Sequence, residues 1–209
     1  MKGAQSFTVA VAQCASLVGQ VEANLQTLSQ LCAEAAAARA DLVLFPECHA
    51  TGYSYRDLAA LVQKTAEPRE GGIGRRLRTL AAEHALVICC GMFERDGDLI
   101  YNTHLVAFPD GRLEGQRKGV LTQKESAVLH AEKKRVAFCW KDVTFGILVC
   151  ADNALPDYRG QIQQLGIKLL LHPSAGSIAT TGEMAEDTLK REAGSALDQA
   201  RQMAKELKL

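Results

Sequence analysis

The apolar positions of the chain follow two patterns, short continuous runs and longer stretches with helical spacing. The continuous runs predict strands at residues 7–13, 41–45, 86–93, 99–108, 135–140, 143–150 and 167–171. The helical spacing predicts helices at residues 24–39, 55–64, 74–84 and 156–165. Turn residues at 96–98 and 141–142 join neighbouring strands as hairpins. Because strand–helix–strand units occur together with hairpins, we expect an α/β fold whose sheets contain both strand directions.

The pattern changes after Ser174. Residues 175–182 are rich in Gly, Ser and Thr, which predicts a linker. Apolar residues then recur near helical spacing at Met184, Leu189, Ala193, Leu197, Ala200, Met203 and Leu207. We therefore expect a domain over residues 1–175, followed by a linker and an amphipathic helix over residues 176–209. This helix should pack on the domain, or alternatively on a partner subunit, because its apolar face is costly to expose.

Composition restricts the function classes. The 209 residues are 47% hydrophobic and 23% charged, as in a soluble globular domain. The 24 basic and 24 acidic residues cancel, so no overall field favours nucleic acid or an anionic membrane. No secretory signal or membrane-spanning stretch is expected. Seven cysteines without a CxxC pair predict no metal site and a reducing, cytoplasmic location in which a thiol is available for catalysis.

Three polar residues follow predicted strands or strand-like segments: Glu47, Lys118 and Cys150. Ligand sites of α/β sheets form at strand ends. Taken singly, however, each residue is more often a surface side chain or a core thiol. Cys150 is favoured because a sharp turn and a predicted helix follow it, with Asp152 or Asn153 as the helix cap. A thiol at a helix N-terminus should have a lowered pKa.

Three sequence blocks resemble the signature blocks of the nitrilase superfamily of carbon–nitrogen hydrolases. They are Leu44-Phe45-Pro46-Glu47, Arg117-Lys118-Gly119-Val120-Leu121 and the block at 146–156, GILVCADNALP. They occur in the family's order and at similar separations, and the segments at 9–13 and 166–175 also look like family strands. The resemblance implies the family's αββα sandwich over residues 7–175, without a metal or organic cofactor.

The resemblance also implies roles for single residues. Glu47 matches the general base, Lys118 the catalytic lysine and Cys150 the nucleophile, while the N–H of Ala151 would join the lysine at the oxyanion. Glu125 matches a second glutamate that orients the lysine and touches the substrate. Two alternatives stay open for that second glutamate: Glu132 could take its place, or Glu125 could be a solvated loop carboxylate.

Two neighbouring features are given no catalytic role. A dyad of Cys48 and His49 is disfavoured because adjacent loop residues usually point apart. His172, before Pro173, is expected to line the mouth of the site or to satisfy backbone groups.

The implied reaction is thiol-dependent hydrolysis of a small linear amide or N-carbamoyl compound through a Cys thioester. Two alternatives are a non-catalytic nitrilase-like binding or regulatory module and a glutaminase module that supplies ammonia to a synthetase. The chain departs from the family at 118–121, where a Lys-x-His-Leu-like block is usual, and at 130–131, where Pro-Gly is usual. It ends one helix after the strand at 167–171, so we expect the sandwich to lack its last strands. The family's helix near a dimer contact implies a homodimer or higher homo-oligomer.

Overall fold

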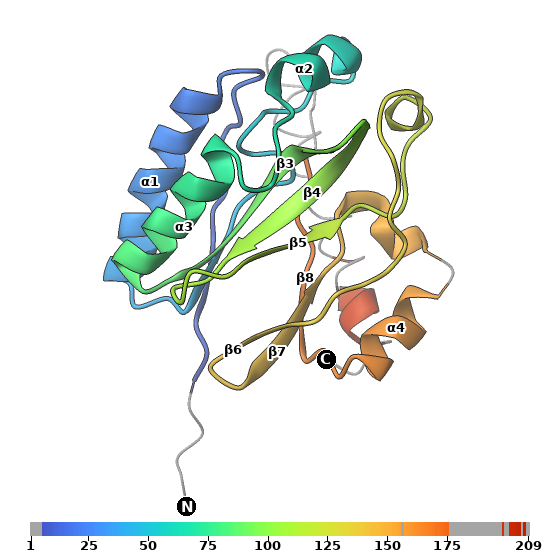
Figure 1. Ribbon diagram of the computed structural model, residues 1–209. Coiled ribbons are helices and arrows are strands. Elements are labelled where there is room, and N and C mark those ends of the chain that lie inside the picture. The colour runs from blue at the N-terminus through green and yellow to red at the C-terminus, as the bar shows by residue number, and fades with distance from the viewer. Residues whose placement is uncertain (1–5, 156, 176–197, 199–200, 206, 208–209) are drawn as a thin grey trace, which may run out of the picture.

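The computed structural model describes residues 6–155, 157–175, 198, 201–205 and 207. Within these residues the strands form two sheets, and helices lie on the outer side of each (Figure 1). The first sheet has the order β1 (Val9–Val11), β2 (Leu42–Leu44), β3 (Val87–Asp96), β4 (Leu99–Ala107) and β5 (Leu113–Arg117). The second has the order β6 (Phe138–Trp140), β7 (Val143–Ile147) and β8 (Leu169–Leu171). The helices are α1 (Val21–Ala37), α2 (Leu58–Thr65), α3 (Gly72–His84) and α4 (Tyr158–Gln164), with short 3₁₀ turns η1 (Glu125–Ala127) and η2 (Cys150–Ala154).

Both sheets mix strand directions, as predicted. β1, β2 and β3 pair in parallel through helical crossovers, whereas β3, β4 and β5 pair antiparallel. In the second sheet, β6 and β7 form the predicted hairpin and β8 pairs parallel to β7. Lys141 and Asp142 in that hairpin turn both have positive φ, which is the backbone that a two-residue turn between twisted strands requires.

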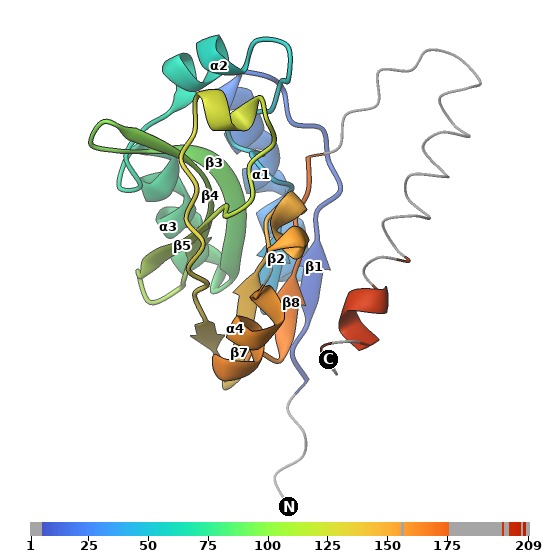
Figure 2. The ribbon, with the colours of Figure 1, turned by 90° about the vertical axis from the view of Figure 1, so that its right-hand side faces the viewer.

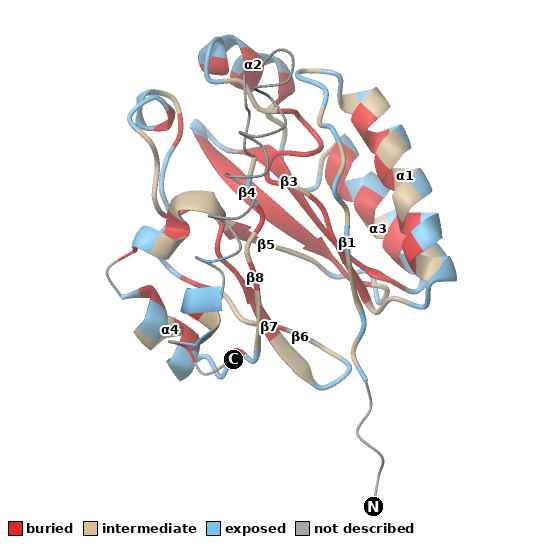
Figure 3. Cartoon of the chain, turned by 180° about the vertical axis from the view of Figure 1, so that it is seen from behind, coloured by how far each residue is buried: buried red, intermediate tan, exposed pale blue. Residues whose placement is uncertain are grey.

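The core lies in layers. Apolar residues of α1 and α3, such as Leu28 and Leu77, cover the outer face of the first sheet. Phe108, Phe138 and Phe145 fill the space between the two sheets, and each buried ring of this size contributes roughly 1.5–3 kcal/mol. α4 covers the second sheet from outside. Figure 1 shows these layers side by side, and Figure 2 views them from the α4 side. Figure 3 shows that β3 and β4 are buried while the outer helices expose one face. The αββα sandwich is therefore confirmed.

Some element boundaries differ from the predictions. β1 covers residues 9–11 rather than 7–13, because only these residues pair with β2 at the edge of the sheet. Its last residue, Val11, is 71% exposed. α2 begins at Leu58 and α4 at Tyr158, both later than the apolar spacing indicated. In the part of the chain that the structure describes, no helix combines the length and the apolar character needed to cross a bilayer.

The C-terminal segment is described only in part. Met203 and Leu207 are each 6% exposed and pack against Leu148, Tyr158 and Ile162 on the outer side of the second sheet. This contact agrees with the expectation that the apolar face packs on the domain. The other apolar positions of the predicted helix (Met184, Leu189, Ala193, Leu197 and Ala200) and the linker over 176–182 lie outside the described residues. The division at residue 175 therefore stays a prediction.

Candidate active site

Glu47 lies in a buried turn just after β2. Its side chain is 2% exposed, and both carboxylate oxygens accept hydrogen bonds. Oε1 accepts from Asn102 Nδ2 at 2.8 Å and from Lys118 Nζ at 2.9 Å, while Oε2 accepts from the Ala175 N–H at 2.9 Å. Three donors from distant parts of the chain thus fix the orientation of this carboxylate.

The turn that carries Glu47 depends on a close backbone approach. Cys48 adopts φ of 52°, a left-handed conformation that costs a non-glycine residue roughly 1–2 kcal/mol. Its backbone lies so near β3 that a Cβ on Gly91 would fall 2.2 Å from the Cys48 nitrogen. Gly91 therefore permits the turn to pack against the sheet.

Lys118 follows directly after β5 and is also 2% exposed. Its N–H donates to the Asn102 carbonyl at 2.8 Å, and its Nζ reaches Glu47 at 2.9 Å and Glu125 at 2.8 Å. Burial alone would lower the pKa of the lysine, but the charges of the two carboxylates and their hydrogen bonds outweigh it and raise that pKa. Lys118 therefore remains a cation inside the protein.

Glu125, in the turn η1, is the second carboxylate at the lysine. It is fully buried, and its Oε2 accepts from the Thr122 N–H at 2.8 Å. Burial raises the pKa of Glu125, but Lys118 and the Thr122 amide outweigh this and lower it. The solvated-loop alternative is wrong for Glu125, and Glu132, the other alternative, is exposed.

Cys150 lies at the sharp turn between β7 and η2, with φ of 49°. Its N–H donates to the Pro173 carbonyl at 2.9 Å, and the His172 ring donates from Nε2 to the Cys150 carbonyl at 2.7 Å. The half-buried sulfur accepts a hydrogen bond from Ser174 Oγ at 3.4 Å. Burial raises the pKa of the thiol, and the charge of Glu47 raises it further, against smaller effects of Ser174 and Lys118 that lower it.

The α-helix after Cys150 begins later than predicted, and neither of its predicted caps is used. Residues 150–154 form a 3₁₀ turn, and α4 begins only at Tyr158. Asp152 does not cap α4. Its carboxylate instead accepts from the backbone N–H groups of Gly119, Val120 and Val149. The expected lowering of the thiol pKa is also wrong, because burial and the charge of Glu47 raise that pKa.

Asn102 and Ser174 are contacts of the site that the sequence did not indicate. Asn102 is fully buried in β4 and joins both charged residues, through its amide to Glu47 and its carbonyl to Lys118. The one available signal was the polar run Asn102-Thr103-His104 in the middle of a predicted strand. As expected, Cys48 and His49 form no dyad: the Cys48 side chain packs among apolar residues, and His49 contacts Ser16 and stacks on Phe45.

A cavity of about 490 Å³ opens beside Glu47 and Ser174. Its polar lining residues are Gln13, Ser16, Glu47, Tyr53, His172 and Ser174, and the remaining lining residues are mostly apolar. His172 lines the cavity and also bonds the Cys150 carbonyl, so it meets both of its expected roles. Among the described residues, no three His, Cys, Asp or Glu side chains gather in a way that could hold a metal ion. Glu47 borders the cavity, and Lys118 and the Cys150 thiol lie next to Glu47 rather than in the cavity lining. The arrangement therefore groups a carboxylate, an ammonium and a thiol at one edge of this cavity.

The carbon–nitrogen hydrolase family model matches residues 8–199. The chain belongs to the carbon–nitrogen hydrolase family. A nitrilase of Pyrococcus abyssi (strain GE5 / Orsay) is 27% identical over 169 residues, covering 79% of this chain and 64% of the relative. An aliphatic nitrilase of Sinorhizobium fredii (strain HH103) is 30% identical over 188 residues, covering 81% and 60%.

A solved structure gives the same family likeness. The CN-hydrolase superfamily protein XC1258 from Xanthomonas campestris, whose active site holds an arsenic adduct, superposes with a TM-score of 0.70 at 26% identity. The match covers 82% of this chain and 65% of that one. This member of the carbon–nitrogen hydrolase family thus spans less than two thirds of the length of each of these three relatives.

Proposed function

We propose that the chain hydrolyses a non-peptide C–N bond in a small linear amide or N-carbamoyl compound through a thioester on Cys150. The observation that carries this proposal is the buried Glu47–Lys118–Glu125 cluster beside a half-buried thiol. Perturbed, desolvated ionisable groups next to a cavity are typical of catalytic sites. The seven free cysteines also support a reducing, cytoplasmic location.

The residues suggest a reaction in two stages. Because the pKa of the Cys150 thiol is raised, the thiol needs a base, and Glu47 accepts its proton as sulfur attacks the carbonyl carbon. Lys118 and the Ala151 N–H stabilise the oxyanion, and Glu125 keeps the ammonium in place. Glu47 then protonates the departing nitrogen as the C–N bond breaks. Finally, Glu47 deprotonates a water that attacks the thioester, which releases the acid and restores the thiol.

A nitrile is the second candidate substrate, because two of the relatives are named nitrilases. Thiolate attack on a nitrile carbon forms a thioimidate instead, and water then converts it to the acid and ammonia. Two further alternatives, a non-catalytic binding module and a glutaminase module, stay open because the chain spans only part of its relatives.

A screen of small amides, N-carbamoyl compounds and nitriles for ammonia release tests the proposal. The wild-type chain should release ammonia, and Cys150→Ala and Cys150→Ser should lose all measurable turnover. Replacing the exposed Cys139 by Ser serves as the matched control and should leave the rate unchanged. Turnover that survives in Cys150→Ala would reject the nucleophile, and no release from any compound would favour a binding module.

A further inference from the structure

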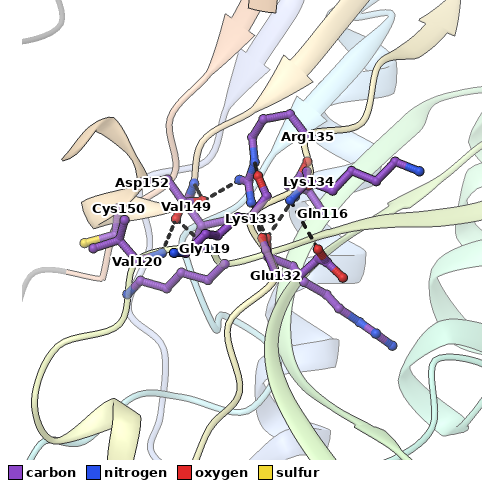
Figure 4. A network of polar contacts seen from close by, with 12 residues as sticks. Gln116, Gly119, Val120, Glu132, Lys133, Lys134, Arg135, Val149, Cys150 and Asp152 are labelled. Carbon is purple, nitrogen blue, oxygen red and sulfur yellow. Dashed lines mark hydrogen bonds and ion pairs between the residues drawn. The ribbon is translucent and has the colours of Figure 1, made fainter. Parts of the chain in front are cut away.

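Asp152 is a buried carboxylate that joins the two loops of the site. It is fully buried, and four donors surround it (Figure 4). Oδ1 accepts from the N–H groups of Gly119 at 2.7 Å and Val120 at 2.9 Å. Oδ2 accepts from Arg135 Nη1 at 2.7 Å and from the Val149 N–H at 3.0 Å. One side chain thus contacts the residues that follow Lys118 and the residue that precedes Cys150.

Arg135 completes the connection from the other side. Its side chain is 2% exposed, and its Nη2 donates to the carbonyl of Arg117 at 3.1 Å and to that of Glu132. The lysine loop is also closely packed against this guanidinium, since a Cβ on Gly119 would lie 2.9 Å from Nη2. Backbone groups on both sides of Lys118 are therefore bonded to the same ion pair.

We propose that the buried Asp152–Arg135 ion pair is a positioning device that fixes the Lys118 loop against the Cys150 turn. This inference rests on the proposed function, because it assumes that Lys118 and Cys150 act on one substrate. Neither Asp152 nor Arg135 touches the substrate in this proposal. They act through the backbone of the two loops, which come from different sheets and share few other polar contacts among the described residues.

A purely structural role is the competing explanation. Buried ion pairs add little net stability compared with apolar side chains of similar size, although removal of one partner strands a charge. A structural role predicts that loss of the pair lowers the melting temperature without a specific effect on Cys150. A positioning role predicts a change in the reactivity of the thiol, because the place of the Lys118 charge sets how far that charge favours the thiolate.

The test measures the rate constant for alkylation of Cys150 by iodoacetamide in the full chain, followed by peptide mass spectrometry. Asp152→Asn and Arg135→Met should each lower this rate constant at neutral pH by about tenfold, because less of the thiol is ionised once the Lys118 charge is displaced. The double variant removes both charges, so no buried charge is left without a partner and the chain should fold. It should show the same decrease in the alkylation rate constant. Leu80→Ala, a core change in α3 remote from both loops, provides the matched control for lowered stability. It should leave Cys150 alkylation within about twofold.

The pH dependence of alkylation separates position from stability. Glu47 and Lys118 act on the thiol through their charges, Ser174 donates to it, and His172 donates to the Cys150 carbonyl. Glu47 is held by Asn102 and Ala175, which are not bonded to the Asp152–Arg135 ion pair. A freed lysine loop should therefore weaken the lysine's effect more than that of Glu47 and move the alkylation midpoint to higher pH.

An unchanged rate constant and midpoint in the double variant would overturn the positioning role. Because alkylation requires no turnover, this outcome is distinct from failure of the proposed function, which Cys150→Ala reports.

Discussion

The two sides of the site are held in different ways. Glu47 and Lys118 come from the five-stranded sheet, are each 2% exposed, and have their charges bonded to buried partners. Cys150 comes from the three-stranded sheet, is half-buried, and lies in a strained turn. Buried charges need complete hydrogen bonding, whereas a nucleophile must remain accessible to a small molecule. The comparison indicates that the charged side is rigid by burial and that the thiol side depends on a few contacts to its turn.

Replacing the ionised side chains of the charged side should have the largest effect on turnover. Lys118→Met and Glu47→Gln should each lower ammonia release by roughly a hundred- to a thousandfold, because an oxyanion donor or the base is lost. Since these residues act as one unit, the double variant should be little worse than either single variant. Initial rates on the substrate found by screening measure this. Lys124→Met, an exposed lysine beside Glu125, should retain activity. Losses that multiply in the double variant would show independent action.

The contact that joins Glu47 to β4 should matter less. Asn102→Leu removes the amide donor but leaves Lys118 and the Ala175 N–H on Glu47, so we expect about a tenfold loss of kcat. A hydrogen bond to a charged group contributes roughly 1.5–3 kcal/mol to stability. Rates and thermal melts give both quantities.

Thr103→Val is the matched control for Asn102→Leu. Thr103 is the next residue of β4, and its hydroxyl bonds Glu94 on the opposite face of the sheet. Thr103→Val should lower the melting temperature about as much as Asn102→Leu does, and it should leave turnover unchanged. An equal loss of turnover in both variants would mean that β4 acts only as a scaffold.

The sequence predicted the residues of this site that lie in local blocks and missed the contacts between distant residues. Glu47, Lys118 and Cys150 were predicted because each lies in a local block whose residue types can be read directly. Asn102 was missed because a single amide within a strand gives no indication of which distant carboxylate it bonds. The wrong helix start after Cys150 has a similar cause. Asp152 accepts a hydrogen bond from the Gly119 N–H, 33 residues away, instead of capping the helix that follows it. A contact between residues so far apart leaves no pattern in the local sequence.

The thiol side should respond to pH with a smaller change. The pKa of Cys150 is raised above the ordinary value of 9.0, chiefly by burial, so its alkylation should keep increasing as the pH passes that value. The Ser174 hydroxyl lowers this pKa through its hydrogen bond, so Ser174→Ala should move the midpoint further upward. Alkylation rates of Cys150 across alkaline pH measure the shift, with Cys139 in the same sample as the internal reference. A downward shift would mean that the hydroxyl does not stabilise the thiolate.

The outermost part of the thiol side should have the smallest effect on turnover. Met203 and Leu207 pack on Leu148 and Ile162, behind the turn that carries Cys150. Replacing both by Ala should leave ammonia release unchanged but lower stability by about 2 kcal/mol or more, which is roughly 4–8 °C in melting temperature for a chain of this size. Arg201→Ala, an exposed position of the same segment, should melt like the wild type.

Deletion of residues 183–209 extends this comparison to the expected homo-oligomer. If the apolar face covers only the second sheet, the deletion should lower the melting temperature and leave the mass measured by light scattering unchanged. If the face also joins two copies of the chain, as the family resemblance implies, the mass should fall to that of one chain. We expect the second result, because seven apolar positions at helical spacing provide more surface than the two that contact the domain in the described residues. Unchanged mass together with unchanged melting would show that the segment stabilises neither the domain nor an assembly.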